Sequence, residues 1–313
     1  MKTISTEIKE LIAVQKKEWE LAAKNFAGLA NVQVREFQFN GFIIKVQFNP
    51  GRIISSAAKV DKKSIEARPC FLCEANRPKE QKGLSLGNCS VLVNPYPIFP
   101  EHFTVPRFAH TPQRIKGNFI TMLELALIME GFIIFYNGPK CGASAPDHFH
   151  FQIGNAGFMP IDDEIGALKQ KYGRKYNKKG TDVWVVKDEL RNFIVLESKK
   201  KSSLNDRFEE IYRAMEEFPD IEEEPMMNIL TSFIAGCWRT LIFPRALHRP
   251  HQYFEDGEKN ILLSPASVDM GGVLITPLEK DFKKIRKEDI EDIFRQVLLS
   301  DEKFGELISK FMN

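Results

Sequence analysis

His148-Phe149-His150-Phe151-Gln152 alternates polar and apolar residues, and this stretch sets the expectations for the rest of the chain. In a β-strand, alternate side chains share a face, so we expect the two histidines and the glutamine on one surface and the phenylalanines buried on the other. One imidazole can bind a metal or be oriented by a neighbour, the next can act as a nucleophile at phosphorus, and the amide can hydrogen-bond a phosphoryl oxygen. The alternative is an edge strand with two surface histidines, because such alternation is common.

The residues upstream of this stretch favour the chemical interpretation. Ile133 to Tyr136 is apolar and predicts a buried strand. Residues 137–147 are rich in glycine, alanine, proline and serine, and predict a loop. Small residues let backbone N–H groups approach an anion. A strand, such a loop and a histidine-bearing strand together indicate a phosphate site.

These residues resemble the transferase branch of the histidine-triad superfamily, which includes galactose-1-phosphate uridylyltransferase, diadenosine tetraphosphate phosphorylase and GDP-L-galactose phosphorylase. The resemblance is carried by Asn137, the turn at residues 142–144 and the pattern His148-x-His150-x-Gln152. It implies an α+β fold, a HIT-like antiparallel sheet with helices, duplicated as two halves of which the second is degenerate. Hydrolase members carry a third histidine where this chain has Gln152, so the resemblance implies nucleotidyl transfer with His150 and Gln152 as catalytic residues.

The same resemblance implies which residues of the loop bind phosphate. Asn137, Gly142, Ala143 and Ser144 correspond to the phosphate-contacting positions. Compared with the uridylyltransferase pattern, Asp147 is an extra residue between the small-residue turn and the first histidine, and this departure bears on the contact expected from Ser144.

A second segment, Val91 to Arg107, resembles the strand, turn and strand that carry a ribose-binding residue in the superfamily. Asn94 occupies that position. The structural alternative is an ordinary turn asparagine ahead of Pro95, which is a common arrangement.

A CxxC pair, Cys70 and Cys73, is a moderately specific signal. A redox pair and two buried core thiols are the alternatives, but no thioredoxin-like strand and helix surround the pair. Two thiolates this close favour zinc, which takes four ligands in a tetrahedron. By resemblance to the zinc site of the uridylyltransferase, the remaining ligands of a structural Zn²⁺ are His110 and His148, with His102 as the rival for the third place.

Composition limits the partners and the compartment. At 313 residues the chain holds one large or two ordinary domains, and its net charge of +2 gives no nucleic-acid signature. Five unevenly spaced cysteines, a charged start unlike a signal peptide and no long apolar run predict a cytoplasmic protein without a membrane or nucleic acid as partner. Basic residues gather before the CxxC pair, where they either attract phosphates or face solvent: Arg52, Lys59, Lys62, Lys63 and Arg68.

Apolar periodicity outlines the remaining elements. Residues 5–28 predict one amphipathic helix, and 32–48 predict a hairpin about Asn40-Gly41. Further helices are expected at 115–131, 161–171 and 204–218, further strands at 183–186 and 193–196, and a basic loop at 172–179.

Two segments echo each other, Pro106 to Pro112 and Pro244 to Pro250, and each follows an apolar run. Because the transferase branch is built from two halves, the echo favours a duplication. We expect a catalytic half at residues 1–200, with the N-terminal helix and the CxxC pair, and a degenerate half at 201–313.

The second half lacks the HxHxQ pattern, so we do not expect it to be catalytic. Its polar residues His248, Arg249 and His251 either face the substrate or belong to an ordinary surface loop.

The chain is therefore predicted to be a nucleotidyltransferase or phosphorylase that acts on a nucleoside diphosphate sugar or a dinucleoside polyphosphate. A nucleotidyl-histidine would form on His150, and orthophosphate or a sugar phosphate would accept the nucleotidyl group. Two alternatives remain open, a dinucleoside polyphosphate hydrolase and a protein that binds nucleotide as a sensor without turnover.

Overall fold

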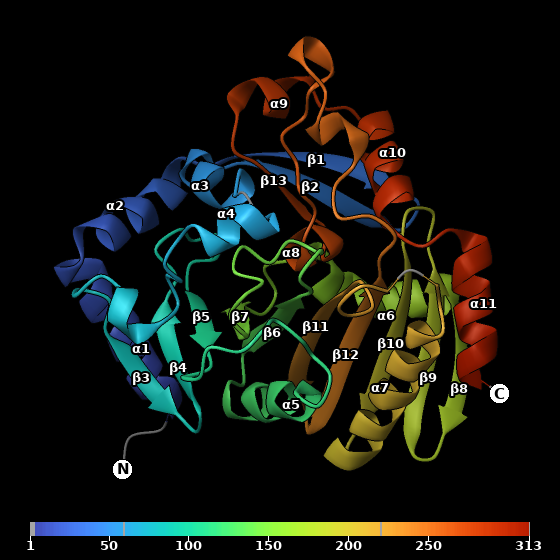
Figure 1. The fold of residues 1–313 in the computed structure, drawn as a ribbon. Coiled ribbons are helices and arrows are strands. Elements are labelled where there is room, and N and C mark those ends of the chain that lie inside the picture. Colours follow the sequence, from blue (N-terminus) through green and yellow to red (C-terminus); the bar gives the residue numbers. More distant parts are fainter. Residues whose placement is uncertain (1–3, 59, 220, 313) are drawn as a thin grey trace.

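A ten-stranded antiparallel sheet forms the centre of the computed structural model, which describes residues 4–58, 60–219 and 221–312 (Figure 1). Its strand order is β3-β4-β5-β7-β6-β11-β12-β10-β9-β8. The first five strands are β3 (Gly83–Leu86), β4 (Cys89–Val93), β5 (His102–Pro106), β6 (Phe132–Asn137) and β7 (His150–Asn155). The other five are β8 (Gly173–Lys178), β9 (Thr181–Lys187), β10 (Asn192–Ser198), β11 (Met227–Ile234) and β12 (Cys237–Pro244).

The order of the strands shows a duplication. From one edge the strands run β3-β4-β5-β7-β6, and from the other edge they run β8-β9-β10-β12-β11. In each half of five strands, the last two are therefore exchanged in the same way. The two halves meet where β6 pairs with β11. A helix joins the third and fourth strands of each half, α5 (Phe119–Ile128) in the first and α7 (Lys201–Glu216) in the second. We propose that the halves divide between β7 and β8, which lies upstream of the division at residue 200 expected from the sequence.

Helices cover one face of the large sheet and enclose the first core (Figure 1). This layer holds α5 and α7 together with α1 (Ile4–Glu18), α2 (Glu20–Gly28) and α11 (Asp301–Met312). Phe119 and Phe208 stack at its centre with ring centroids 3.9 Å apart. The single helix expected over residues 5–28 is in fact two, because the backbone is extended at Trp19, whose side chain is buried in this core.

A three-stranded sheet and further helices cover the opposite face and enclose the second core (Figure 1). Its strands are β1 (Gln33–Phe39), β2 (Phe42–Phe48) and β13 (Val273–Thr276). The predicted hairpin about Asn40-Gly41 is confirmed, and Gly41 has the positive φ of 92° that such a turn requires. β13 pairs in parallel with β2, so segments that are more than 200 residues apart in sequence lie side by side in this sheet.

The rest of this second layer consists mostly of short segments. Its helices are α3 (Ile53–Ser56), α4 (Lys62–Glu66), α6 (Pro160–Tyr172), α8 (Ser267–Met270), α9 (Glu279–Lys284) and α10 (Lys287–Val297). The stretch before the CxxC pair, in which the basic residues gather, contains two of these short helices, α3 and α4. Among the described residues no helix is long and apolar enough to cross a membrane, and all five cysteines are free thiols.

The basic loop expected at residues 172–179 is wrong, because β8 occupies most of this segment and pairs with β9. β8 is the edge strand of the large sheet. Exposed lysines are typical of edge strands, where they discourage pairing with other chains. Lys175 is held 2.8 Å from Asp182 across the hairpin. The turn at Lys179-Gly180 has φ values of 51° and 81°, as a two-residue hairpin turn requires.

Candidate active site

His150 is the first residue of β7, and its hydrogen bonds leave one ring nitrogen available. Nδ1 lies 2.8 Å from the carbonyl oxygen of His148, and because a carbonyl only accepts, Nδ1 carries the proton. Nε2 makes no hydrogen bond in the described part of the chain and therefore keeps its lone pair. Burial lowers the pKa of His150 to about 4, so the ring is neutral at physiological pH. A neutral imidazole with a fixed tautomer is poised to act as a nucleophile.

The side chain of Gln152 is oriented by His102, a buried residue of β5. The Nδ1 of His102 accepts the N–H of Ile98, so its Nε2 is the protonated nitrogen and donates to Oε1 of Gln152 over 3.0 Å. With its oxygen engaged, the amide of Gln152 can present its NH₂ group to an oxyanion. His102 was the rival zinc ligand in the sequence analysis. It lies on β5, which pairs with β7, and it is outside the cluster of Cys70, Cys73, His110 and His148.

Gln113 fixes the start of β7, and the sequence analysis did not identify it. Its Oε1 accepts the N–H of His150 over 2.7 Å, and its Nε2 donates to the carbonyl oxygens of His150 and Asn137. A buried glutamine that satisfies three backbone groups holds the ends of β6 and β7 together. A proline-flanked glutamine carries no sequence signal for this role, because its partners are distant in sequence.

The loop between β6 and β7 exposes backbone donors. Gly142, Ala143 and Ser144 line a cavity, and within the described chain their N–H groups make no hydrogen bond. Gly142 has a φ of 93°, and a Cβ there would lie 2.5 Å from the Cβ of Ala266. Only glycine therefore lets this loop pack against the second half of the chain. The arrangement is compatible with the predicted phosphate-binding role, which stays a prediction.

Asn137 ends β6 and reaches the same cavity. Its Oδ1 accepts hydrogen bonds from the side chain of Asn228 and the N–H of Ser267, over 3.0 and 2.8 Å. Its Nδ2 has no partner in the described part of the chain, and the residue lines the cavity. The amide is thus oriented by the second half of the chain with its NH₂ group available.

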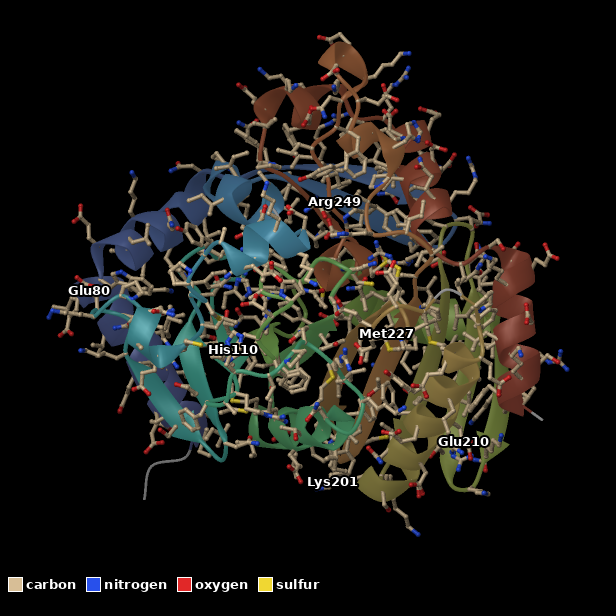
Figure 2. All side chains as sticks on the ribbon, viewed as in Figure 1. Glu80, His110, Lys201, Glu210, Met227 and Arg249 are labelled. Atoms are coloured by element: carbon tan, nitrogen blue, oxygen red, sulfur yellow. The ribbon has the colours of Figure 1, made fainter. Side chains whose placement is uncertain are left out.

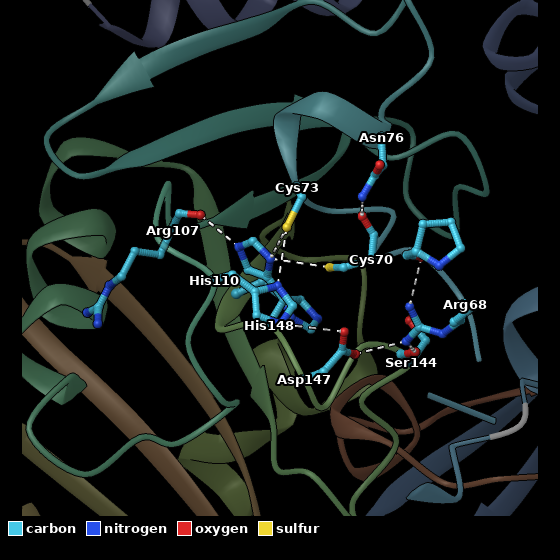
Figure 3. Close-up of polar contacts among 11 residues, drawn as sticks. Arg68, Cys70, Cys73, Asn76, Arg107, His110, Ser144, Asp147 and His148 are labelled. Carbon is cyan, nitrogen blue, oxygen red and sulfur yellow. Dashed lines mark hydrogen bonds and ion pairs between the residues drawn. The ribbon is translucent and has the colours of Figure 1, made fainter. Parts of the chain in front are cut away.

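Four predicted zinc ligands converge beside the active strand (Figure 3). The ligand atoms of Cys70, Cys73, His110 and His148 all lie within 4.8 Å of one another. Nδ1 of His148 is 3.3 Å from Sγ of Cys70, and Nδ1 of His110 is 3.2 Å from Sγ of Cys73. Two thiolates and two imidazoles at these separations fit a tetrahedral zinc ion.

The ligands of this cluster are themselves held by hydrogen bonds. Nε2 of His148 donates to the carbonyl oxygen of Arg107 over 2.8 Å, which leaves Nδ1 free for a metal. Asp147 pairs with Arg68 over 2.9 Å and also approaches Nε2 of His110, at 4.0 Å (Figure 3). Asp147, the extra residue of the loop, therefore supports the four candidate ligands.

Contrary to the expected alternation, His148 lies in a turn before β7 and not in the strand.

A cavity of about 550 Å³ opens in front of His150 and Gln152. Its walls are largely apolar, and the aromatic residues Trp19, Phe71 and Tyr96 contribute to them. Asn94 lines it as well, but its Oδ1 accepts the N–H of Tyr96 over 2.9 Å, as a turn asparagine would. The turn role considered for Asn94 is therefore present, and its place in the wall is compatible with the ribose role.

Residues of the second half also border the site, and Figure 2 shows one of them, Arg249, above His110 in this view. His248 and Arg249 line a smaller cavity next to the loop, whereas His251 lies elsewhere, beside α10, and is exposed. The predicted basic cluster divides in a similar way. Arg52 lines both cavities and Arg68 the larger one. Lys62 and Lys63 are exposed, and Lys59 lies outside the described residues.

Residues 11–155 match a family described as a domain of unknown function (DUF4922), and residues 171–313 match the family "GDPGP1-like, C-terminal domain". No curated protein matches the chain by sequence.

Among solved structures, the chain is similar to yeast Ap4A phosphorylase Apa2 at 16% identity. The TM-score is 0.55 for the structure of that protein without a named ligand, with 90% of this chain and 94% of that chain covered. For the complexes with Ap4A and with AMP it is 0.57, with 91% and 90% of this chain and 97% of each of those chains covered.

The chain shares the overall fold of the yeast Ap4A phosphorylase, and its second half matches the GDPGP1-like family model. The predicted α+β class and the HIT-like antiparallel sheet are confirmed by the shared fold. The two matched families divide the chain between residues 155 and 171, close to the boundary between β7 and β8.

Proposed function

We propose that this chain is a nucleotidyltransferase of the phosphorylase type, in which His150 becomes covalently nucleotidylated. The observation that carries the proposal is the hydrogen bond that Nδ1 of His150 donates to the carbonyl oxygen of His148. Because the proton is on Nδ1, Nε2 is unprotonated, and the residue lies at the wall of a nucleotide-sized cavity. The similarity to a GDPGP1-like family and to an Ap4A phosphorylase supports a nucleoside diphosphate sugar or a dinucleoside polyphosphate as donor.

In the first step, the lone pair of His150 Nε2 attacks the α-phosphorus of the donor. The bond from the α-phosphorus to its bridging oxygen breaks, and the leaving phosphate takes the electron pair. The NH₂ group of Gln152, oriented by His102, donates to a non-bridging oxygen as negative charge develops there. In the second step, an acceptor oxygen attacks the same phosphorus, and the electron pair of the P–N bond returns to Nε2.

The remaining site residues position the nucleotide in this proposal. The aromatic wall of the large cavity holds the base, and Asn94 contacts the ribose with the second lone pair of Oδ1. Asn137 and the N–H groups of residues 142–144 bind the phosphates.

A Zn²⁺ ion held by Cys70, Cys73, His110 and His148 has a structural role here. Bound there, it would supply a fixed tetrahedral centre and no chemistry at phosphorus. His148 precedes the nucleophile by two residues and provides the carbonyl that orients it. Immobilising His148 therefore fixes the tautomer of His150.

Mass spectrometry tests the proposal directly. The wild-type chain is mixed with single donors from a panel of nucleoside diphosphate sugars and dinucleoside polyphosphates, without an acceptor. We expect the mass of one nucleoside monophosphate to be added to His150, and none in His150→Ala, whose zinc content and unfolding temperature should be close to those of the wild type.

The outcome separates the alternatives. A hydrolase would release nucleoside monophosphate steadily without need of an acceptor. A sensor would bind a nucleotide with no adduct and no product. Turnover with inversion of configuration at phosphorus would contradict the covalent mechanism, because two displacements retain it.

A further inference from the structure

A small cavity of about 60 Å³ adjoins the nucleotide cavity. Arg52, Ser144 and Gln152 line both, so the two spaces meet beside the amide that faces the reacting phosphorus. The small cavity is built by both halves of the chain, since Asn137 and residues 142–144 come from the first, and His248 and Arg249 from the second.

Two arginines face this cavity with hydrogen-bonding capacity unused. Arg249 donates from Nε to Ser264 and from Nη2 to the carbonyl oxygen of Ala58, over 3.1 and 3.0 Å, and its guanidinium carbon lies 4.1 Å from the ring centroid of Tyr253. Arg52 donates from Nη1 to the carbonyl oxygen of Tyr96, and its buried Nε has no partner. Both guanidinium groups are held in place with N–H groups left over.

Neither cation is neutralised by a close carboxylate in the described chain, where no ion pair within 4.0 Å involves Arg52 or Arg249. Asp269 is the one acid among the described residues that line the cavity. Its carboxylate already accepts the N–H groups of Ala266 and Ile275, over 2.8 and 3.3 Å. The cavity therefore combines two cations, free backbone donors and the free amide of Asn137, which is the chemistry that recognises a phosphate group.

We propose that Arg52 and Arg249 bind the phosphate next to the α-phosphorus, first as part of the leaving group and then as the acceptor. This inference rests on the proposed function. In the second step an oxygen of the bound phosphate forms the new bond to the α-phosphorus, and the P–N bond to His150 breaks with its electron pair returning to Nε2. The product is a nucleoside diphosphate when the acceptor is orthophosphate. The two halves together thus select a phosphate over water as acceptor, and the degenerate half contributes Arg249.

His248 fits this role without adding a third charge. Burial and the nearby cations Arg249, Arg245 and Lys140 lower its pKa to about 3, so the imidazole is neutral in the cavity. A neutral ring can share a hydrogen bond with a phosphate oxygen.

Titration of the unreacted chain with inorganic phosphate, followed by ³¹P NMR line broadening, tests the subsite without a donor. Loss of a charge-assisted hydrogen bond corresponds to a factor of about 10–100 in affinity. We expect Arg249→Met and Arg52→Met to weaken phosphate binding by that factor and Arg249→Lys to weaken it less. The matched control is Arg174→Met, an exposed arginine of β8, and it should bind phosphate like the wild type. Unfolding temperatures identify variants that fail to fold.

A second measurement follows the discharge of the His150 adduct by orthophosphate, by glucose 1-phosphate and by water. In Arg249→Met the phosphate concentration for half-maximal discharge should rise about 10–100-fold, while discharge by water is unchanged. The comparison between the two phosphates identifies the acceptor. Arginine-dependent phosphate binding without any adduct would refute the proposed function but keep the subsite. The subsite would be overturned if Arg249→Met and the wild type needed the same phosphate concentration for half-maximal discharge of the adduct. It would also be overturned if the wild type bound no phosphate.

Discussion

The two halves of the large sheet differ most where each connects its fourth strand to its fifth. In the first half, residues 138–149 join β6 to β7 and carry the free backbone donors and His148. In the second half, Ala235 and Gly236 alone join β11 to β12 in a tight turn. The strands pair in the same way in both halves. The comparison teaches that the same strand pairing occurs with and without the long loop, and that the proposed nucleophile lies only in the half that carries the loop.

The echo between Pro106–Pro112 and Pro244–Pro250 does not mark equivalent positions. It follows β5 in the first half and β12 in the second, yet the strand order makes β10 the counterpart of β5. Arg107 lies over the ring of Phe149, with its guanidinium carbon 4.8 Å from the centroid. Arg245 is instead buried and donates to several carbonyl oxygens. The duplication is real, but the echo that suggested it is not evidence for it.

The largest expected difference between the halves concerns their cysteines. Cys73→Ser should lower bound zinc from about one ion per chain to less than a tenth and lower the unfolding temperature by about 5–10 °C, because a structural metal stabilises the folded state strongly. Cys237→Ser, at the start of β12, is the control and should change neither. Metal analysis and thermal unfolding measure both variants. The metal site would be refuted if wild-type protein that contains no zinc had the same unfolding temperature as wild-type protein supplied with zinc.

A smaller effect is expected from the buried hydrogen bonds of the two halves. His102→Phe removes the donor that orients Gln152 and should slow formation of the His150 adduct by about 10–100-fold, with nucleotide affinity little changed. Thr240→Val breaks a buried bond of 2.9 Å between Thr240 and Thr231 in the second half, and should cost about 1 kcal/mol of stability without slowing adduct formation. Single-turnover kinetics and denaturant unfolding distinguish the two. Equal rates in both variants would remove His102 as a positioning residue.

The pH dependence of the first half follows from burial of its nucleophile. The neutral form of His150 is reactive, and because its pKa is lowered to about 4, the rate of adduct formation should stay level from pH 8 to about pH 5.5 and fall below that. A free imidazole would already lose half its rate near pH 6.5. Rapid pH jumps measure the rate before any acid unfolding. A midpoint near 6.5 would mean that His150 is solvated when it reacts.

The smallest effect concerns the turn that replaces the loop in the second half. Ala235 has a φ of 49°, a left-handed conformation that suits asparagine or glycine better than alanine. Ala235→Asn should raise the free energy of unfolding by about 0.5–1 kcal/mol and leave adduct formation unchanged. Denaturant unfolding measures the free energy of unfolding, and single-turnover kinetics measure the rate of adduct formation. A slower reaction would show that this turn influences the nucleophile.

Much of the site could be predicted from short motifs. The HxHxQ stretch, the small-residue loop and the CxxC pair each lie within a few residues of sequence, so their chemistry is visible in the residue types. Local patterns also predicted the first hairpin and most strands of the sheet. They failed at β8, where lysines resembled a loop, and at Trp19, where burial in the first core accompanies a break between two helices.

The sequence by itself predicted His150 as the nucleophile, the small-residue loop as a phosphate site and the CxxC pair as two zinc ligands, because each depends on residue type and close spacing. The two histidine ligands, which lie 37 and 75 residues beyond Cys73, followed only from the family resemblance. Only the tertiary structure decided that His102 orients Gln152, that Gln113 fixes β7 and that Arg249 joins Arg52 at one cavity. The separation in sequence is 37 residues between Gln113 and His150 and 50 residues between His102 and Gln152. Between Arg52 and Arg249 it is 197 residues. Side chains that far apart meet only after the sheet has formed, and burial then sets which hydrogen bonds and charges they keep.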